Sequence, residues 1–349
     1  MSTTPSVPVP GTVRRITALA VGAGLALALT GCSAPAPGGQ GSDELAPAAL
    51  QLGWLPNIEN GVYVLGGEKG YFEDEGIELE ILPGGPDVTV DAQIVGGGAL
   101  VGLMSTQTLA DAVRNGAPLV GIAALYQFSS TSITMLADSG IEEIEDLAGT
   151  RIGVTTGQEV TLLPFLEWVG VDTADIEIVT VDGSATPLVT DQVDALYTTL
   201  GNVPVVLEAQ GTPTTSFAVA DYGYNRWSSI LVVREDSLED PDKLEQIKAI
   251  LRGTLASAED FIADPEAAGE LVYEVYGDQL GLERESQVDG AVVWADLIER
   301  GADLNEGGLL EITEKGVAST QALFDDILDI DLDAADLFDL SAQEGVLGE

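Results

Sequence analysis

The sequence predicts an α/β protein of two lobes that are hinged at two crossover segments. Strand-like and helix-like segments alternate from about residue 50 to 235, which implies parallel strands joined by right-handed crossovers. The chain has 349 residues, too many for one compact core of ordinary size. An apolar segment near residue 230 can return the chain to the first lobe. One lobe would therefore interrupt the other, and closure would bend only the crossovers near residues 130 and 225.

The amino terminus predicts export. Arg14 and Arg15 precede an apolar run that ends at residue 30, shorter than the roughly 20 apolar residues of a spanning helix. The run ends in Leu29-Thr30-Gly31-Cys32, which resembles the lipobox of bacterial lipoproteins. The alternative is an ordinary secretory signal with a chance cysteine. We expect a signal peptide at 1–31, lipidation of Cys32 and an extracytoplasmic protein anchored in the cell membrane by that lipid.

Residues 32–49 are rich in Ala, Pro, Gly and Ser, so we expect them to form a flexible tether. We assign residues 50–129 and 226–349 to lobe 1, which includes the C-terminal helices. Residues 130–225 form lobe 2.

Composition excludes several function classes. The chain has no histidine, and its one cysteine is the expected lipid site. This excludes Ser-His-Asp and Cys-His catalysis, the usual zinc sites and internal disulfides, so we predict no catalytic residue, metal or cofactor. With 58 acidic and 13 basic residues, the net charge is −45. Binding of nucleic acid is excluded, because binding phosphates requires basic clusters. The acidity suits salty surroundings or a basic partner, and it disfavours anionic ligands unless a local cation or helix N-terminus compensates.

The elements of lobe 1 follow from apolar patterns and helix-capping signals. Its strands are expected at 50–53, 77–82, 100–104, 119–125 and 229–233. Helices are expected at 61–69, 88–95, 106–115, 242–263, 265–276, 285–298 and 314–327. Asp240-Pro241 and Asp264-Pro265 each supply a cap and a proline for the first helical position.

Lobe 2 is predicted in the same way. Its strands are expected at 132–137, 151–154, 176–181 and 194–197, with helices at 142–147 and 161–169. In open sheets of this kind, ligands bind beyond the carboxyl ends of the strands. Residues that follow strands are therefore the candidate site residues.

Six segments carry a resemblance to a known family: 52–57, 61–64, 68–79, 83–86, 146–154 and 191–195. Together they resemble the SsuA/THI5-like (NMT1-type) substrate-binding proteins of ABC transporters. The resemblance implies a periplasmic-binding-protein-like (type II) clamshell, and a lipoprotein that delivers a small-molecule solute to a transporter permease without catalysing a reaction. We expect a monomer.

Candidate ligand-binding residues follow the strands or lie in the crossovers. Trp54 suits stacking on a planar ring, and Asn57 suits hydrogen bonds to its edge. By resemblance, Gln127 matches a glutamine of the pyrimidine-precursor branch, and Tyr197 to Asn202 lie where the family contacts its solute. The remaining candidates are Tyr63, Gly85, Ser105, Thr106, Thr155, Thr156, Gly157 and Trp227.

Each candidate has a structural alternative. Trp54 could pack under its loop, Gly85 could serve only a turn, and the hydroxyl groups could cap helices. Arg226, beside Trp227, has two interpretations: an anion clamp or a partner in a structural ion pair.

The ligand is expected to be a flat, neutral, nitrogen-containing heterocycle such as a thiamine pyrimidine precursor. Sulfonates and riboflavin stay open, because Asn60 and the segment 199–202 depart from the pyrimidine-binding pattern. Two other classes of function are possible: a tethered sensor, and a pyrimidine-synthesising enzyme. The enzyme is disfavoured because fungal members of this superfamily use an active-site histidine, which this chain lacks.

Overall fold

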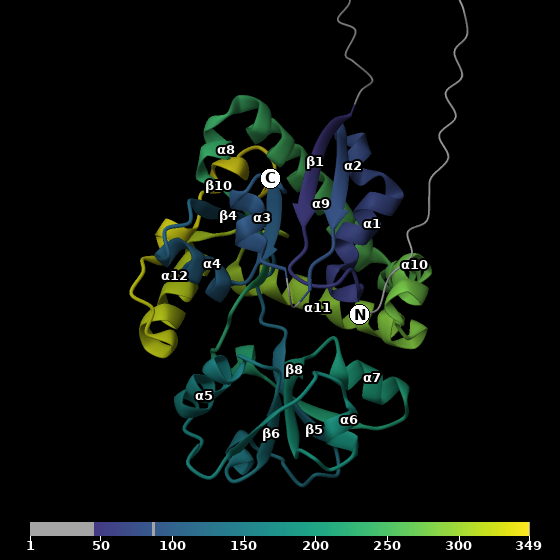
Figure 1. Cartoon of the computed structure of the whole chain (residues 1–349), viewed down its shortest axis with the longest axis vertical. Coiled ribbons are helices and arrows are strands. Elements are labelled where there is room, and N and C mark those ends of the chain that lie inside the picture. The colour runs from purple at the N-terminus through teal and green to yellow at the C-terminus, as the bar shows by residue number, and fades with distance from the viewer. Residues whose placement is uncertain (1–44, 86–87, 349) are drawn as a thin grey trace, which may run out of the picture. The chain divides into compact units, whose positions relative to one another are not determined.

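A computed structural model describes residues 45–85 and 88–348. The expected signal peptide, Cys32 and most of the expected tether lie outside these residues. The described part of the chain contains two five-stranded mixed sheets (Figure 1). None of its helices is both long enough and apolar enough to cross a membrane.

The first sheet has the strand order β2-β1-β3-β10-β4. Its strands are β1 (Ala46–Gln51), β2 (Ile77–Leu82), β3 (Val101–Met104), β4 (Leu119–Tyr126) and β10 (Ser228–Arg234). β1 pairs in parallel with β2 and β3, whereas β10 runs antiparallel between β3 and β4. The prediction of parallel pairing is thus wrong for β10. This strand comes from the second sheet and enters the first at the carboxyl ends of β3 and β4, so it must run in the opposite direction.

β1 begins four residues before the expected strand, within the segment that was assigned to the tether. The Ala46 N–H donates to the Gly76 carbonyl at 2.8 Å, and the Leu52 N–H donates to the Leu82 carbonyl at 2.9 Å. The backbone N–H groups of even-numbered residues in β1 therefore point toward β2, and the backbone nitrogen of Pro47 points toward the opposite neighbour, β3. There β3 pairs only with Leu50 and Gln51, so the missing N–H of Pro47 breaks no ladder bond.

The second sheet has the order β7-β6-β8-β5-β9. Its strands are β5 (Thr131–Leu136), β6 (Arg151–Val154), β7 (Glu177–Thr180), β8 (Ala195–Thr199) and β9 (Thr214–Ala218). β6 pairs in parallel with β7 and β8, whereas β5 runs antiparallel to β8 and β9. The prediction of parallel pairing is therefore wrong for β5 as well. The helices on this side are α5 (Glu159–Trp168), α6 (Thr186–Val189) and α7 (Val203–Ala209), with a 3-10 turn, η2, at Ile144–Leu147.

The N-terminal helices of the first sheet follow the predicted signals. They are η1 (a 3-10 turn, Ile58–Asn60), α1 (Gly61–Lys69), α2 (Tyr71–Asp74), α3 (Val90–Val95) and α4 (Thr106–Arg114). α1 ends at Gly70, whose φ of 79° is a left-handed cap that glycine adopts at little cost.

The C-terminal part is helical. It contains α8 (Glu235–Glu239), α9 (Pro241–Ala263), α10 (Pro265–Leu280), α11 (Arg284–Asn305) and α12 (Glu314–Leu323), followed by a π turn, η4, at Phe324–Leu328 and short 3-10 turns at Ala334–Leu337 and Leu340–Ala342. Another 3-10 turn, Val219–Tyr222, lies between β9 and β10. The two aspartate caps are confirmed: Asp240 accepts from the N–H groups of Asp242 and Lys243, and Asp264 accepts from that of Ala267.

The chain passes between the two sheets twice, through residues 127–130 and 219–227. The two crossovers are joined by hydrogen bonds. The Ser129 N–H donates to the Asn225 side chain at 2.8 Å, and the Asn225 amide donates to the Gln127 carbonyl at 2.9 Å. The end of α12 also connects the two sheets. Leu323 packs in the apolar core of the second sheet, and the next residue, Phe324, packs in an apolar core of the first.

Candidate functional site

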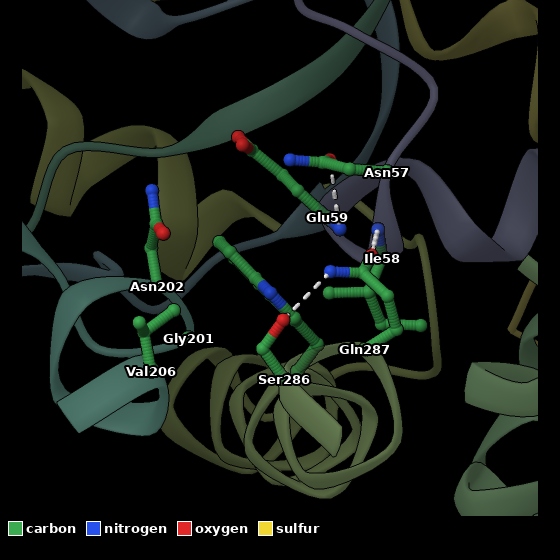
Figure 2. A pocket seen from close by; sticks show the side chains of 9 residues that line it. Asn57, Ile58, Glu59, Gly201, Asn202, Val206, Ser286 and Gln287 are labelled. Atoms are coloured by element: carbon green, nitrogen blue, oxygen red, sulfur yellow. Dashed lines mark hydrogen bonds between the residues drawn. The ribbon is translucent and has the colours of Figure 1, made fainter. Parts of the chain in front are cut away.

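A small polar cavity lies where segments attached to the two sheets meet (Figure 2). Its volume of about 30 Å³ has room for about two water molecules. Three elements line it: η1 with its preceding residue, α11, and the loop from β8 into α7. The lining residues are Asn57, Ile58, Glu59, Gly201, Asn202, Val206, Ser286, Gln287 and Trp294.

Hydrogen bonds join η1 to α11 on one wall of the cavity. The Ile58 N–H donates to the Gln287 side-chain carbonyl at 2.9 Å, and the Gln287 amide donates to the Ser286 hydroxyl at 3.2 Å (Figure 2). The Asn57 side chain accepts from the Glu59 N–H at 3.2 Å and so caps η1. Two segments more than 200 residues apart in the sequence are thereby held in one site.

Gly201 brings the loop of the second sheet against α11. A β-carbon at this position would lie 2.4 Å from the indole nitrogen of Trp294, so no larger residue fits this arrangement. Trp294 is 1% exposed and lies against Tyr126, with ring centroids 4.8 Å apart. Its indole N–H has no acceptor among the described residues, which leaves a buried donor at the cavity wall.

Glu59 supplies the titratable group of the cavity. Burial raises the pKa of its carboxyl group to about 7. Its backbone carbonyl accepts a hydrogen bond from the Tyr126 hydroxyl at 2.7 Å, which fixes the η1 backbone. In Figure 2 its carboxyl group and the amides of Asn57 and Asn202 project away from α11. At neutral pH this group can therefore donate or accept a hydrogen bond.

Two of the predicted site residues, Asn57 and Asn202, line this cavity. Trp54 lies in the loop after β1 with 41% of its surface exposed, and its carbonyl accepts from the Gly84 N–H at 2.9 Å. Gly85 follows with a φ of 153°. Tyr63 is fully buried in the core on α1, its hydroxyl has no partner among the described residues, and desolvation raises its pKa well above the ordinary value.

The predicted hydroxyl residues after β3 make contacts within the protein. Ser105 caps α4 by accepting from the Thr108 N–H at 3.2 Å. The Thr106 hydroxyl accepts from the Trp227 N–H at 3.1 Å. Trp227 itself is 1% exposed and packs on Phe338, in the apolar core of the first sheet.

Gln127, predicted as a polar contact in the hinge, is 1% exposed. Its amide donates to the carbonyl groups of Ala124 at 3.2 Å and Glu311 at 2.9 Å, while its side-chain oxygen has no partner among the described residues. Thr155 is partly exposed, and Thr156 and Gly157 are exposed in the turn before α5. Tyr197 on β8 is 3% exposed, and its hydroxyl has no hydrogen-bond partner among the described residues.

The sequence did not predict six of the lining residues: Ile58, Glu59, Val206 and, on α11, Ser286, Gln287 and Trp294. Glu59 lies in the same segment after the first strand as Asn57, so its position after a strand was a signal that could have identified it. The α11 residues carry no local signal, because only the packing of a C-terminal helix against η1 brings them to the cavity. A second, more open hollow of about 570 Å³ lies on α12 and the segment after it, and none of the predicted residues lines it.

Comparison with known proteins gives one family and several relatives. A family model described as "NMT1/THI5 like" matches residues 57–268. The riboflavin-binding protein RibY of Chloroflexus aurantiacus is 24% identical over 330 residues, covering 86% of this chain and 92% of RibY. The formylaminopyrimidine-binding protein of Halalkalibacterium halodurans is 24% identical, covering 65% and 69%.

Relatives of other names also match. A 4-amino-5-hydroxymethyl-2-methylpyrimidine phosphate synthase of Legionella pneumophila is 28% identical, covering 64% of this chain and 72% of the synthase. Among solved structures, the periplasmic aliphatic sulphonate-binding protein SsuA of Escherichia coli aligns with a TM-score of 0.59 at 16% identity, covering 80% of this chain and 86% of SsuA. The predicted periplasmic-binding-protein-like (type II) fold is thereby confirmed.

Proposed function

Because the chain belongs to the NMT1/THI5-like family, we propose that it is an extracytoplasmic solute-binding protein of an ABC importer. One observation carries the proposal: a polar cavity is lined from both sheets, and two hydrogen-bonded crossovers join those sheets. A solute held there would be contacted from both sides, as binding between two hinged lobes requires. The lipid on Cys32, the permease partner and the monomeric state belong to the same proposal.

The solute enters when the lobes separate. A cavity of about 30 Å³ is far below the several hundred Å³ of ordinary ligand pockets. The crossovers are the segments that can absorb the change, since each holds few residues between one sheet and the other. Closure would then bring the loop after β8 back toward α11, with the solute held between them.

The ligand we favour is a small organic molecule with a nitrogen-containing ring. The cavity presents amides from Asn57 and Asn202, the Glu59 carboxyl group and a free indole N–H, which suit the donor and acceptor edge of such a ring. Riboflavin and sulfonates are the alternatives, and relatives bear the names of all three ligand types. Catalysis is not part of the proposal, although some relatives are named synthases.

A thermal-shift screen tests this function. The protein is heated with pyrimidines, flavins, sulfonates and amino acids, and a true ligand at a hundred times its dissociation constant adds about 2.7 kcal/mol of stability. Trp54→Ala should weaken that ligand by at least tenfold, or about 1.4 kcal/mol, in calorimetry. Trp168→Ala is the control, because Trp168 is also exposed but lies at the end of α5, whereas Trp54 lies in the loop that leads to Asn57. No shift with any compound would contradict the function, and an unchanged affinity would remove Trp54 from the site.

A further inference from the structure

In a strongly acidic protein, Arg226 has no carboxylate partner among the described residues. The chain carries 58 acidic residues, and each of the six other arginines in the described residues lies within 4.0 Å of a carboxylate: Arg114, Arg151, Arg234, Arg252, Arg284 and Arg300. Among the described residues, Arg226 makes no ion pair with a carboxylate, and its Nε atom is buried without a hydrogen-bond partner. The ion-pair interpretation of Arg226 is thus wrong within the described part of the chain. The Arg226 side chain is half-buried, and a partly desolvated cation without an anion points to a partner from outside.

Other unpartnered polar atoms lie on the segments around Arg226. Among the described residues, neither the buried hydroxyl of Tyr197, on β8, nor that of Ser228, two residues after Arg226, makes a hydrogen bond of ordinary geometry. Burial raises the pKa of Tyr197, and the charge and hydrogen-bonding of the nearby Arg226 guanidinium partly offset this rise. These hydroxyl groups and the guanidinium are all hydrogen-bond donors, which is the chemistry of an anion site.

The fold also holds Arg226 firmly in place. Asn225 binds the first crossover through the Ser129 N–H and the Gln127 carbonyl, and the Trp227 backbone binds Thr106. On the side of the second sheet, the Tyr224 ring lies 5.8 Å from the guanidinium carbon of Arg226. The guanidinium therefore lies where the two sheets are joined, with its backbone neighbours fixed on both sides.

Two helix N-termini are anchored to the same segments. α4 begins at Thr106, which is bonded to Trp227, and α5 is bonded to Tyr224 through the Thr161 carbonyl at 3.1 Å. Helix N-termini favour negative charge, and here they add to a buried donor group rather than standing alone.

We propose that Arg226, with the hydroxyls of Tyr197 and Ser228, forms a subsite for an acidic group on the solute, a sulfonate, carboxylate or phosphate. This inference rests on the proposed function and narrows it, because the solute would carry negative charge despite the acidic surface. An acidic group would supply an acceptor for the Nε atom of Arg226, which has none among the described residues.

Calorimetry with matched pairs of compounds tests the subsite. The pairs are an alkanesulfonate and the sulfonamide of equal length, riboflavin and its phosphate ester, and an aminopyrimidine alcohol and its phosphate ester. In at least one pair, the acidic member should bind at least tenfold tighter than the neutral one. Arg226→Gln should abolish that difference, and Arg226→Lys should keep part of it because the charge remains. Arg234→Gln is the control, because Arg234 pairs with Asp236 at the far end of β10.

Thermal unfolding separates this role from a structural one. Arg226→Gln should leave the unfolding midpoint unchanged or raise it, whereas Arg151→Gln, which loses a 2.7 Å contact with Asp194, should lower it. Tighter binding of the neutral members, or an acidic preference that survives in Arg226→Gln, would overturn the subsite and leave the binding function standing. Failure of every compound to bind would contradict both proposals.

Discussion

The carboxyl group of Glu59 lies in the cavity between the sheets, and burial raises its pKa from 4.5 to about 7. In the unfolded chain the same group ionises near its ordinary value. Between these two values the folded protein binds a proton that the unfolded chain has released. Stability therefore falls as the pH rises through this window, because the folded state must then hold a partly desolvated negative charge.

Glu59→Gln should remove this pH dependence. Relative to the variant, the wild type should lose about 1–2 kcal/mol of unfolding free energy between pH 4 and pH 8, after allowance for the partial exposure of the side chain. Urea unfolding at several pH values measures the difference. Glu299→Gln, on an exposed position of α11, should track the wild type throughout. Parallel curves for wild type and Glu59→Gln would show that the folded protein does not perturb this carboxyl group.

At the scale of the element, α1 is positioned by close packing as well as by its glycine cap. Gly66 and Gly67 are neighbours in this helix but face different surroundings. A β-carbon on Gly66 would lie 2.7 Å from the Phe72 ring, whereas one on Gly67 would lie 3.4 Å from Ile81, an ordinary contact. The helix thus tolerates a side chain at one of the two positions only.

Alanine at these two positions should change stability in opposite directions. Gly67→Ala should stabilise the protein by about 0.5–1 kcal/mol, because alanine favours the helix over glycine. Gly66→Ala gains the same propensity but should destabilise the protein by about 1–3 kcal/mol through overpacking against Phe72. Chemical denaturation measures both, and each variant serves as the control for the other. Equal effects would mean that packing against Phe72 does not restrict α1.

Local signals explain which elements the sequence could predict. The bounds of α1, β2 and β6 were predicted to the residue, because a glycine or an apolar run marks their ends. α6, α7 and β9 were missed, since they are short and their residues lack a clear apolar period. Alternation of strands and helices does not predict the direction of a strand that returns to the sheet from the other lobe. The antiparallel direction of β10 could therefore not be predicted from the sequence.

The site was predictable to a similar extent. Asn57 and Asn202 each follow a strand, and both line the cavity. Gln287 and Trp294 reach it from α11 only through the tertiary packing of that helix. For Arg226 the sequence left two interpretations open, because no local pattern shows whether a carboxylate lies beside it in the fold.

In the whole molecule, the proposed binding requires two lobes that close on a solute. The crossovers are tied to each other through Asn225, and residues 323–328 contact the apolar cores of both sheets. We therefore expect the chain to bend only at the two crossovers and at residues 323–328. The contact of Gly201 with Trp294 belongs to the wall of the cavity. Separation of that contact would open the site without disrupting either sheet.

The most direct test of this account is the distance between the lobes with and without a solute. Spin labels at Glu73→Cys on α2 and Val189→Cys on α6, in a chain with Cys32→Ser, report it by pulsed electron resonance. Saturation with the tightest-binding compound of the calorimetric pairs should replace a broad distribution with a narrower one at shorter distance. A distribution that stays the same at saturation would contradict closure of two lobes on a guest.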